Sequence, residues 1–224
     1  MVLLGDLAFP EVGERRTLVL PLGSTEQHGA HLPLDTDTVI ATTVATRAAA
    51  RIPAAVVAPA LAIGAAGEHA GFAGTLSIGT EVLASAIVEI VRTAGPEFER
   101  TVLVNGHGGN VGAIRSAVKT CDFEGRPIRA WSARLDKAAI GFDLHAGRIE
   151  TSIMLAIAPE RVRLGAAEPG VSEGSEGLIR ELMERGVKAV SPNGVLGDPT
   201  GACADEGARI LDEWVDQVAQ LLTR

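Results

Sequence analysis

The stretch TLVLPLGSTEQHGAHLPLDTD, residues 17–37, joins an apolar run to a dense set of acidic and imidazole side chains. Residues 17–22 are mostly aliphatic and predict a buried strand. Two histidines and three acidic residues then fall within the twelve positions 26–37. A loop that only connects two elements does not need this density of ligand-capable groups. The stretch therefore predicts a functional site at the end of a strand.

The rest of the chain alternates short β-branched runs with amphipathic segments, the pattern of βαβ units. Further strands are predicted at 55–58, 101–105 and 128–132. Helices are predicted at 38–51, 81–93, 111–119, 150–157, 173–185 and 205–222. No internal repeat, low-complexity tract or linker interrupts this order. We therefore expect an α/β fold with a mostly parallel sheet in one domain, residues 1–224.

Composition narrows the class of protein. The formal net charge is -8 and no run of Lys or Arg exceeds two residues, so neither nucleic acid nor an anionic membrane is an expected partner. No apolar stretch reaches the length of a membrane span, about 18 residues or more. The two cysteines, Cys121 and Cys203, suit neither a disulfide framework nor a Cys-rich zinc site. We expect a cytoplasmic protein with free thiols.

The five histidines of the chain are the most informative residues. Each lies beside a glycine or an acid in a polar loop, and the loops GSTEQHG, IGAAGEHAGFAGT and NGHGGN each follow a predicted strand. DLHAG precedes a predicted helix. Because the carboxyl ends of parallel strands line the ligand crevice of such sheets, we expect these loops to converge.

Imidazole and carboxylate are ligands of divalent transition metals. Glu26 and His28 alternate in an extended segment, so both can face one cavity. Asp37 precedes a predicted helix and could bridge two ions with its two oxygens. The alternative for Asp37 is the N-cap of that helix.

His107 projects from the glycine-rich NGHGGN turn, between a strand and a helix. Phosphate loops occupy the same place in other folds, but neither glycine-rich nucleotide-binding motif is present. A metal ligand is the favoured interpretation of His107.

His145 and Glu150 lie in HAGRIETS at the start of a predicted helix. The unperturbed pKa of histidine makes His145 the candidate proton carrier. Glu150 is a candidate ligand or base, and the alternative is a first-turn carboxylate that stabilises the helix dipole. Glu68 and His69 are candidates for supporting a ligand or for contacting substrate. No G-x-S-x-G motif indicates a serine nucleophile.

The motifs PLGSTEQHGAHLPLDTD, GEHAGFAGT, NGHGGN, HAGRIETS and GVLGDPTGA together resemble the creatininase family of metal-dependent amidohydrolases, over nearly the whole chain. The resemblance implies an α/β/α sandwich, two divalent ions and a homohexamer. It also implies that Glu26 and His107 bind one ion, that His28 binds the other, and that Asp37 bridges them. His31, Glu68, His69, Asn105 and Asn110 are the remaining candidates for support of the site or substrate contact.

One position departs from the pattern. In the creatinine-hydrolysing members the residue corresponding to Gly109 is a carboxylate that binds metal, and Glu150 is the nearest substitute in this chain. This departure makes creatinine a poor candidate substrate.

The expected function is therefore that of a two-metal amide hydrolase in which His145 delivers a proton to the departing amine. The nitrogen and oxygen ligands suit Zn²⁺, Fe²⁺ or Mn²⁺. The residues of these motifs most resemble those of a peptidase branch of the family, whose members remove a C-terminal Val-Tyr dipeptide from a short modified precursor peptide. The alternatives are an enzyme acting on a small cyclic amide or formamide and, from another class, a non-catalytic metal-binding scaffold.

Overall fold

Residues 2–14, 17–95, 97–133, 142–173 and 177–223 are described by a computed structural model, and within them four parallel strands form one sheet. The strands β1 (Thr17–Leu22), β2 (Ala55–Val57), β3 (Arg100–Asn105) and β4 (Ile128–Ser132) lie in the order β2-β1-β3-β4. β1 and β3 pair over six residues and end together, because Leu22 lies opposite Asn105. The loops that follow these two strands therefore begin side by side.

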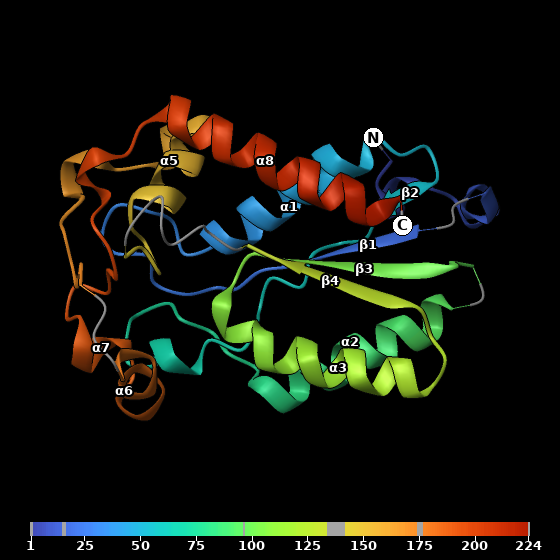
Figure 1. Ribbon diagram of the computed structural model, residues 1–224, viewed down its shortest axis with the longest axis horizontal. Helices are drawn as coiled ribbons and strands as arrows, with labels where there is room; N and C mark the ends of the chain where they lie inside the picture. Colours follow the sequence, from blue (N-terminus) through green and yellow to red (C-terminus); the bar gives the residue numbers. More distant parts are fainter. Residues whose placement is uncertain (1, 15–16, 96, 134–141, 174–176, 224) are drawn as a thin grey trace.

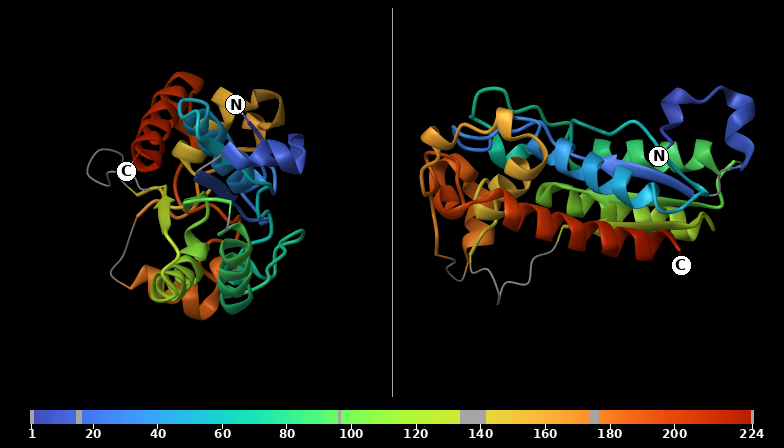
Figure 2. Two further views of the ribbon diagram at one scale, coloured as in Figure 1. Left: turned by 90° about the vertical axis from the view of Figure 1, so that its right-hand side faces the viewer. Right: turned by 90° about the horizontal axis from the view of Figure 1, so that it is seen from above.

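Helices cover both faces of this sheet (Figure 1). On one face lie α1 (Thr36–Ala49), α5 (Arg148–Ile157) and α8 (Ala204–Leu222). On the other lie α2 (Thr80–Ala94) and α3 (Val111–Phe123), and the end-on view in Figure 2 shows the two layers apart. The predicted α/β/α sandwich with a parallel sheet is confirmed.

Alternating strand residues build a separate core on each face, since successive side chains of a strand point in opposite directions. Val19 and Val102 pack in the cluster with α1, α5 and α8. Leu20 and Leu103 pack in the cluster with α2 and α3. A third, smaller cluster holds α6 (Leu178–Arg185) and α7 (Val187–Val190), near the carboxyl ends of the strands.

The predicted strands agree with the structure to within one residue, whereas several helices differ at an end. α1 begins at Thr36, two residues earlier than predicted. α3 runs on to Phe123, because Cys121 still faces the core. α6 begins at Leu178, since Gly177 has a left-handed φ of 100°, and residues 174–176 of the predicted helix lie outside the described residues. Within the described residues, no helix combines the length and apolar character needed to cross a membrane.

Candidate metal centre

All five histidines are buried, and four of them meet at the carboxyl end of the sheet. The ring centroid of His145 lies 4.3 Å from that of His28 and 4.4 Å from that of His69, which is 6.1 Å from that of His107. The loop after β1, the turn at Gly67–His69, the turn after β3 and the segment before α5 supply them. The expected convergence of the loops is thus present in the structure.

Glu26, Asp37 and His107 form the first group that could hold a metal ion. The Nδ1 atom of His107 is 3.2 Å from Glu26 Oε1 and 3.2 Å from Asp37 Oδ2. On the other side of the ring, Nε2 donates to the carbonyl oxygen of Ala65 at 3.3 Å. A donor bond of this kind fixes the ring and leaves the opposite nitrogen for a metal.

His28, Asp37 and Glu150 form the second group. The Nε2 atom of His28 is 3.1 Å from Asp37 Oδ1 and 3.9 Å from Glu150 Oε2, while Nδ1 donates to the carbonyl oxygen of Glu26 at 3.1 Å. Asp37 belongs to both groups and turns one oxygen to each. We call the two groups together the cage.

His145 belongs to a third group, with Glu26 and His28. Its Nδ1 atom is 3.6 Å from Glu26 Oε1. The ring therefore lies against the cage, where a proton carrier must be if it is to exchange protons with a molecule bound in the cage.

The segment before α5 positions Glu150 through an unusual backbone conformation. Ala146 is the one non-glycine residue in the described part of the chain with a positive φ, 51°. Its N–H donates to Glu150 Oε2 at 2.6 Å. Strained backbone of this kind tends to occur at functional sites.

The charges of the cage are unbalanced without a cation. Burial is the largest single effect on the pKa of His28 and lowers it, but the carboxylates of Asp37, Glu150 and Glu26 together outweigh burial and raise this pKa to about 10. Burial raises the pKa of Glu150 to about 8. The negative charge of the buried carboxylates is therefore compensated either by protons on groups such as His28 and Glu150 or by a bound cation.

Unpartnered buried atoms test whether a metal fits. Among the described residues, Glu26 Oε1 and Asp37 Oδ2 are buried carboxylate oxygens without a hydrogen-bond partner. Such atoms are costly unless something compensates them. Both belong to the groups above, where imidazole nitrogens face them, so the donor set fits a divalent transition metal.

The capping alternative for Asp37 is wrong. α1 begins one residue before it, so Asp37 lies in the first turn, and Asp35 occupies the N-cap position without a capping hydrogen bond. Glu150 does lie in the first turn of α5, as its helix-dipole alternative requires, but its carboxylate faces His28.

The remaining predicted residues surround the cage. His69 Nε2 is 3.3 Å from Glu26 Oε1. Asn105 Nδ2 donates to the carbonyl oxygen of His107 at 2.7 Å, and Asn110 Nδ2 donates to that of Gly23 at 3.0 Å. These two amides brace the NGHGGN turn rather than enter the cage.

His31 lies farther along the loop after β1. Its Nε2 is 3.0 Å from the hydroxyl of Thr151 on α5, while Nδ1 has no hydrogen-bond partner among the described residues.

Glu68 occupies the space beside Gly109. Its Oε1 is 3.4 Å from His107 Nε2. A Cβ atom on residue 109 would lie 2.3 Å from Glu68 Oε1 and 2.4 Å from the carbonyl oxygen of Ala65. The backbone cannot accept a carboxylate side chain at this position without moving.

Gln27 is the residue at the site that sequence reasoning missed. Its amide contacts His69, His145 and the carbonyl of Gly194 at 2.9–3.0 Å. Side-chain amides are rarely metal ligands in sites of this kind, so the motif did not indicate Gln27 as a site residue. Its position between the candidate ligands Glu26 and His28 was the signal available.

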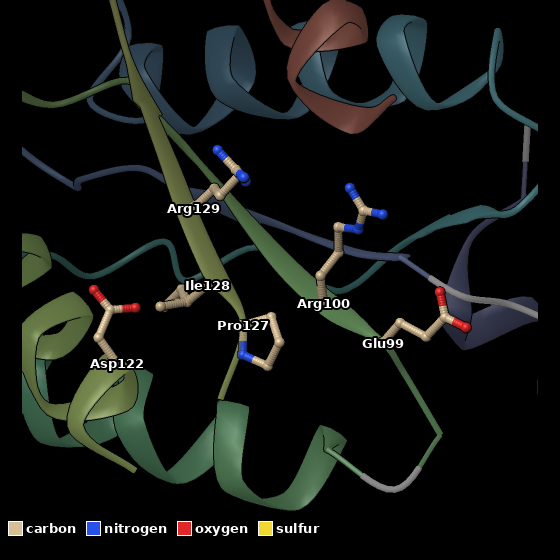
Figure 3. A pocket seen from close by; sticks show the side chains of 6 residues that line it. All are labelled: Glu99, Arg100, Asp122, Pro127, Ile128 and Arg129. Atoms are coloured by element: carbon tan, nitrogen blue, oxygen red, sulfur yellow. The ribbon is translucent and has the colours of Figure 1, made fainter. Parts of the chain in front are cut away.

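Two other features lie apart from the cage. Trp131 packs edge-on against Trp214 in the core, with centroids 5.5 Å apart, and so does not cover the cage. A cavity of about 500 Å³ opens at the amino ends of β3 and β4, opposite the cage, and is shown in Figure 3. Its lining residues are Glu99, Arg100, Asp122, Pro127, Ile128 and Arg129.

Residues 6–222 match the family model Creatininase, described as creatinine amidohydrolase. The chain is 48% identical over 216 residues to the mycofactocin precursor peptide peptidase of Mycobacterium ulcerans, covering 93% of this chain and 85% of that protein. It is 33% identical over 196 residues to the creatinine amidohydrolase of Pseudomonas putida, covering 73% of this chain and 74% of that protein.

The solved structures that resemble this chain include creatininases as well. A crystal structure of creatinine amidohydrolase (creatininase) superposes with a TM-score of 0.80 at 26% identity, covering 99% of this chain and 96% of that one. A structure described as "Creatininase Mn" gives a TM-score of 0.80 at 26% identity and covers 99% and 97%.

Proposed function

The chain belongs to the creatininase family, and from this membership and the cage we propose that it is a metal-dependent peptidase acting on a modified precursor peptide. Relatives at 45–48% identity over more than nine tenths of the chain are named mycofactocin precursor peptide peptidase. The bond cleaved is the one that releases a C-terminal Val-Tyr dipeptide, as the resemblance of the motifs implies.

One geometric observation is the main support for a two-metal hydrolase: two groups of nitrogen and oxygen donors share Asp37. Glu26 and His107 would hold one ion, His28 and Glu150 the other, and Asp37 both. Divalent ions in such a site lower the pKa of a water toward neutrality and polarise the scissile carbonyl. Zn²⁺, Fe²⁺ and Mn²⁺ all suit these donors.

The side chains of the protein perform the proton transfers. His145 lies against the cage with Nδ1 facing Glu26, so this atom can take a proton from the attacking water and give it to the departing amine. Its burial excludes bulk water from this path. A closed structural site would not need an imidazole held beside the ligands in this way.

Gly109 favours the peptide over creatinine. The resemblance places a metal-binding carboxylate at this position in the creatinine-hydrolysing members, whereas here Glu68 and the backbone of Ala65 fill the space. The assembly and compartment that we propose from the family, a homohexamer in the cytoplasm, are tested by light scattering and by cell fractionation.

Mass spectrometry of a mycofactocin-type precursor peptide, treated first with its maturase, tests the substrate. We expect the loss of Val-Tyr from the C-terminus, and little or no ring opening of creatinine assayed in parallel. A small formamide serves as a third substrate. Faster turnover of creatinine or the formamide, with the peptide left whole, would assign the chain to another branch of the family.

A further inference from the structure

The buried amide of Gln27 has its orientation fixed from both ends. Its Oε1 accepts a hydrogen bond from the N–H of Gly29 at 2.9 Å, and its Nε2 donates to the carbonyl oxygen of Gly194 at 2.9 Å. A backbone N–H can only donate and a carbonyl can only accept. The amide therefore cannot be flipped, and its NH₂ group faces the histidines.

The same reasoning fixes the proton of His145. Its Nε2 is 2.8 Å from the backbone carbonyl oxygen of Gln27 and 3.0 Å from the amide nitrogen of that side chain. Because the carbonyl only accepts, Nε2 must carry the proton and donate it there. A protonated Nε2 cannot also accept from the amide.

The second amide hydrogen is then left for His69. The Nδ1 atom of His69 is 3.0 Å from Gln27 Nε2, so it accepts that hydrogen and is unprotonated. The proton of His69 is consequently on Nε2, which is 3.3 Å from Glu26 Oε1.

We propose that Gln27 is a positioning residue that holds the proton on Nε2 in both His69 and His145. His145 then turns an unprotonated Nδ1 toward the cage, and His69 turns an N–H toward Glu26. Gly194 belongs to this arrangement, because a Cβ atom there would lie 1.9 Å from Gln27 Oε1.

The consequence for catalysis rests on the proposed function. In its resting tautomer His145 must accept a proton before it can deliver one. The water proton moves to Nδ1 as the oxygen attacks the carbonyl carbon, and it passes to the amine nitrogen as the C–N bond breaks. One nitrogen thus serves as base and then as acid.

Nuclear magnetic resonance of the zinc-loaded enzyme, labelled with ¹⁵N-histidine, tests the proposal directly. The chain has only five histidines, and the long-range ¹H–¹⁵N pattern of each ring shows which nitrogen carries the proton. In the wild type we expect His69 and His145 each as a single tautomer with the proton on Nε2.

Gln27→Met separates the two histidines. It removes the amide but keeps the backbone carbonyl, so His145 should retain its tautomer while His69 loses its single-tautomer pattern. We expect kcat to fall by about 10- to 100-fold, as for other residues that orient ligands. Gln217→Met, which removes an amide that bonds Trp131 in the core, is the matched control and should change neither ring pattern.

A wild-type His69 protonated on Nδ1 would overturn the proposal, as would an unchanged His69 in a folded Gln27→Met protein. The wild-type measurement decides the tautomers even if this variant does not fold. Because the spectra are recorded without substrate, a failure of peptide hydrolysis would remove the proposed function and leave the tautomer result standing.

Discussion

Asp37 turns Oδ1 toward His28 and Oδ2 toward His107. In Asp37→Asn the amide keeps the shape but loses the charge and one metal-binding oxygen. We expect activity to fall by more than about 100-fold, above the usual loss for residues outside the ligand shell. Elemental analysis should show less than the full metal content, while the circular dichroism spectrum keeps its wild-type form.

Asp35→Asn is the control for this change. Asp35 lies two positions away and pairs with Arg161 near the surface. Its loss should cost at most about 1 kcal/mol of stability and leave turnover intact. Full metal content and wild-type turnover in Asp37→Asn would end the assignment of Asp37 as a shared ligand.

His145 should affect rate more than binding, because proton transfer is needed only in the transition state. We expect His145→Ala to lower kcat by about 10²- to 10⁴-fold with a small change in KM. Steady-state kinetics on the peptide measure both. A variant that raised KM alone would show that the ring serves to bind substrate.

At the scale of elements, α5 and α8 approach so closely at Gly207 that no side chain fits. A Cβ atom there would lie 1.9 Å from the carbonyl oxygen of Ser152 on α5. Gly207→Ala should therefore lower the free energy of unfolding by about 1–3 kcal/mol or more, measured by urea denaturation. α5 also carries Glu150, so we expect weaker metal binding as well.

Gly112→Ala on α3 is the matched helix substitution. A Cβ atom there meets only Thr80 Cγ2, at 3.4 Å. Alanine should be neutral or stabilise by up to about 1 kcal/mol, because it has the higher helix propensity. Equal destabilisation of both variants would mean that the α5–α8 contact is not the cause.

Local sequence pattern predicted the elements well where side-chain period decides them, as in β1 and β3. It was less accurate where a single backbone angle decides the end of a helix. The left-handed φ of Gly177, for example, makes α6 begin at Leu178. For the site, residue type and strand position were enough to bring Glu26 and His107 together. Gln27 was missed because its role depends on Gly194, far away in the chain, and local pattern carries no information on that contact.

At the scale of the whole molecule, an ion bound only by the folded chain should stabilise it by mass action. Free metal at about 100 times its Kd would add about 2.7 kcal/mol. Thermal unfolding of the chelated protein, with and without added Mn²⁺ or Zn²⁺, measures this shift, and activity should return with the ions. If added metal does not change the unfolding temperature and activity survives chelation, the cage does not hold catalytic metal ions.

The residues of the cage also leave the ribosome at very different times. Glu26, Asp37 and His107 are all made within the first half of the 224-residue chain, whereas Glu150 lies about two thirds of the way along it. A nascent polypeptide therefore contains every member of the first group well before the second can close. A chain whose translation stops before α5 therefore contains every residue of the first group but lacks Glu150, and so cannot form the second group.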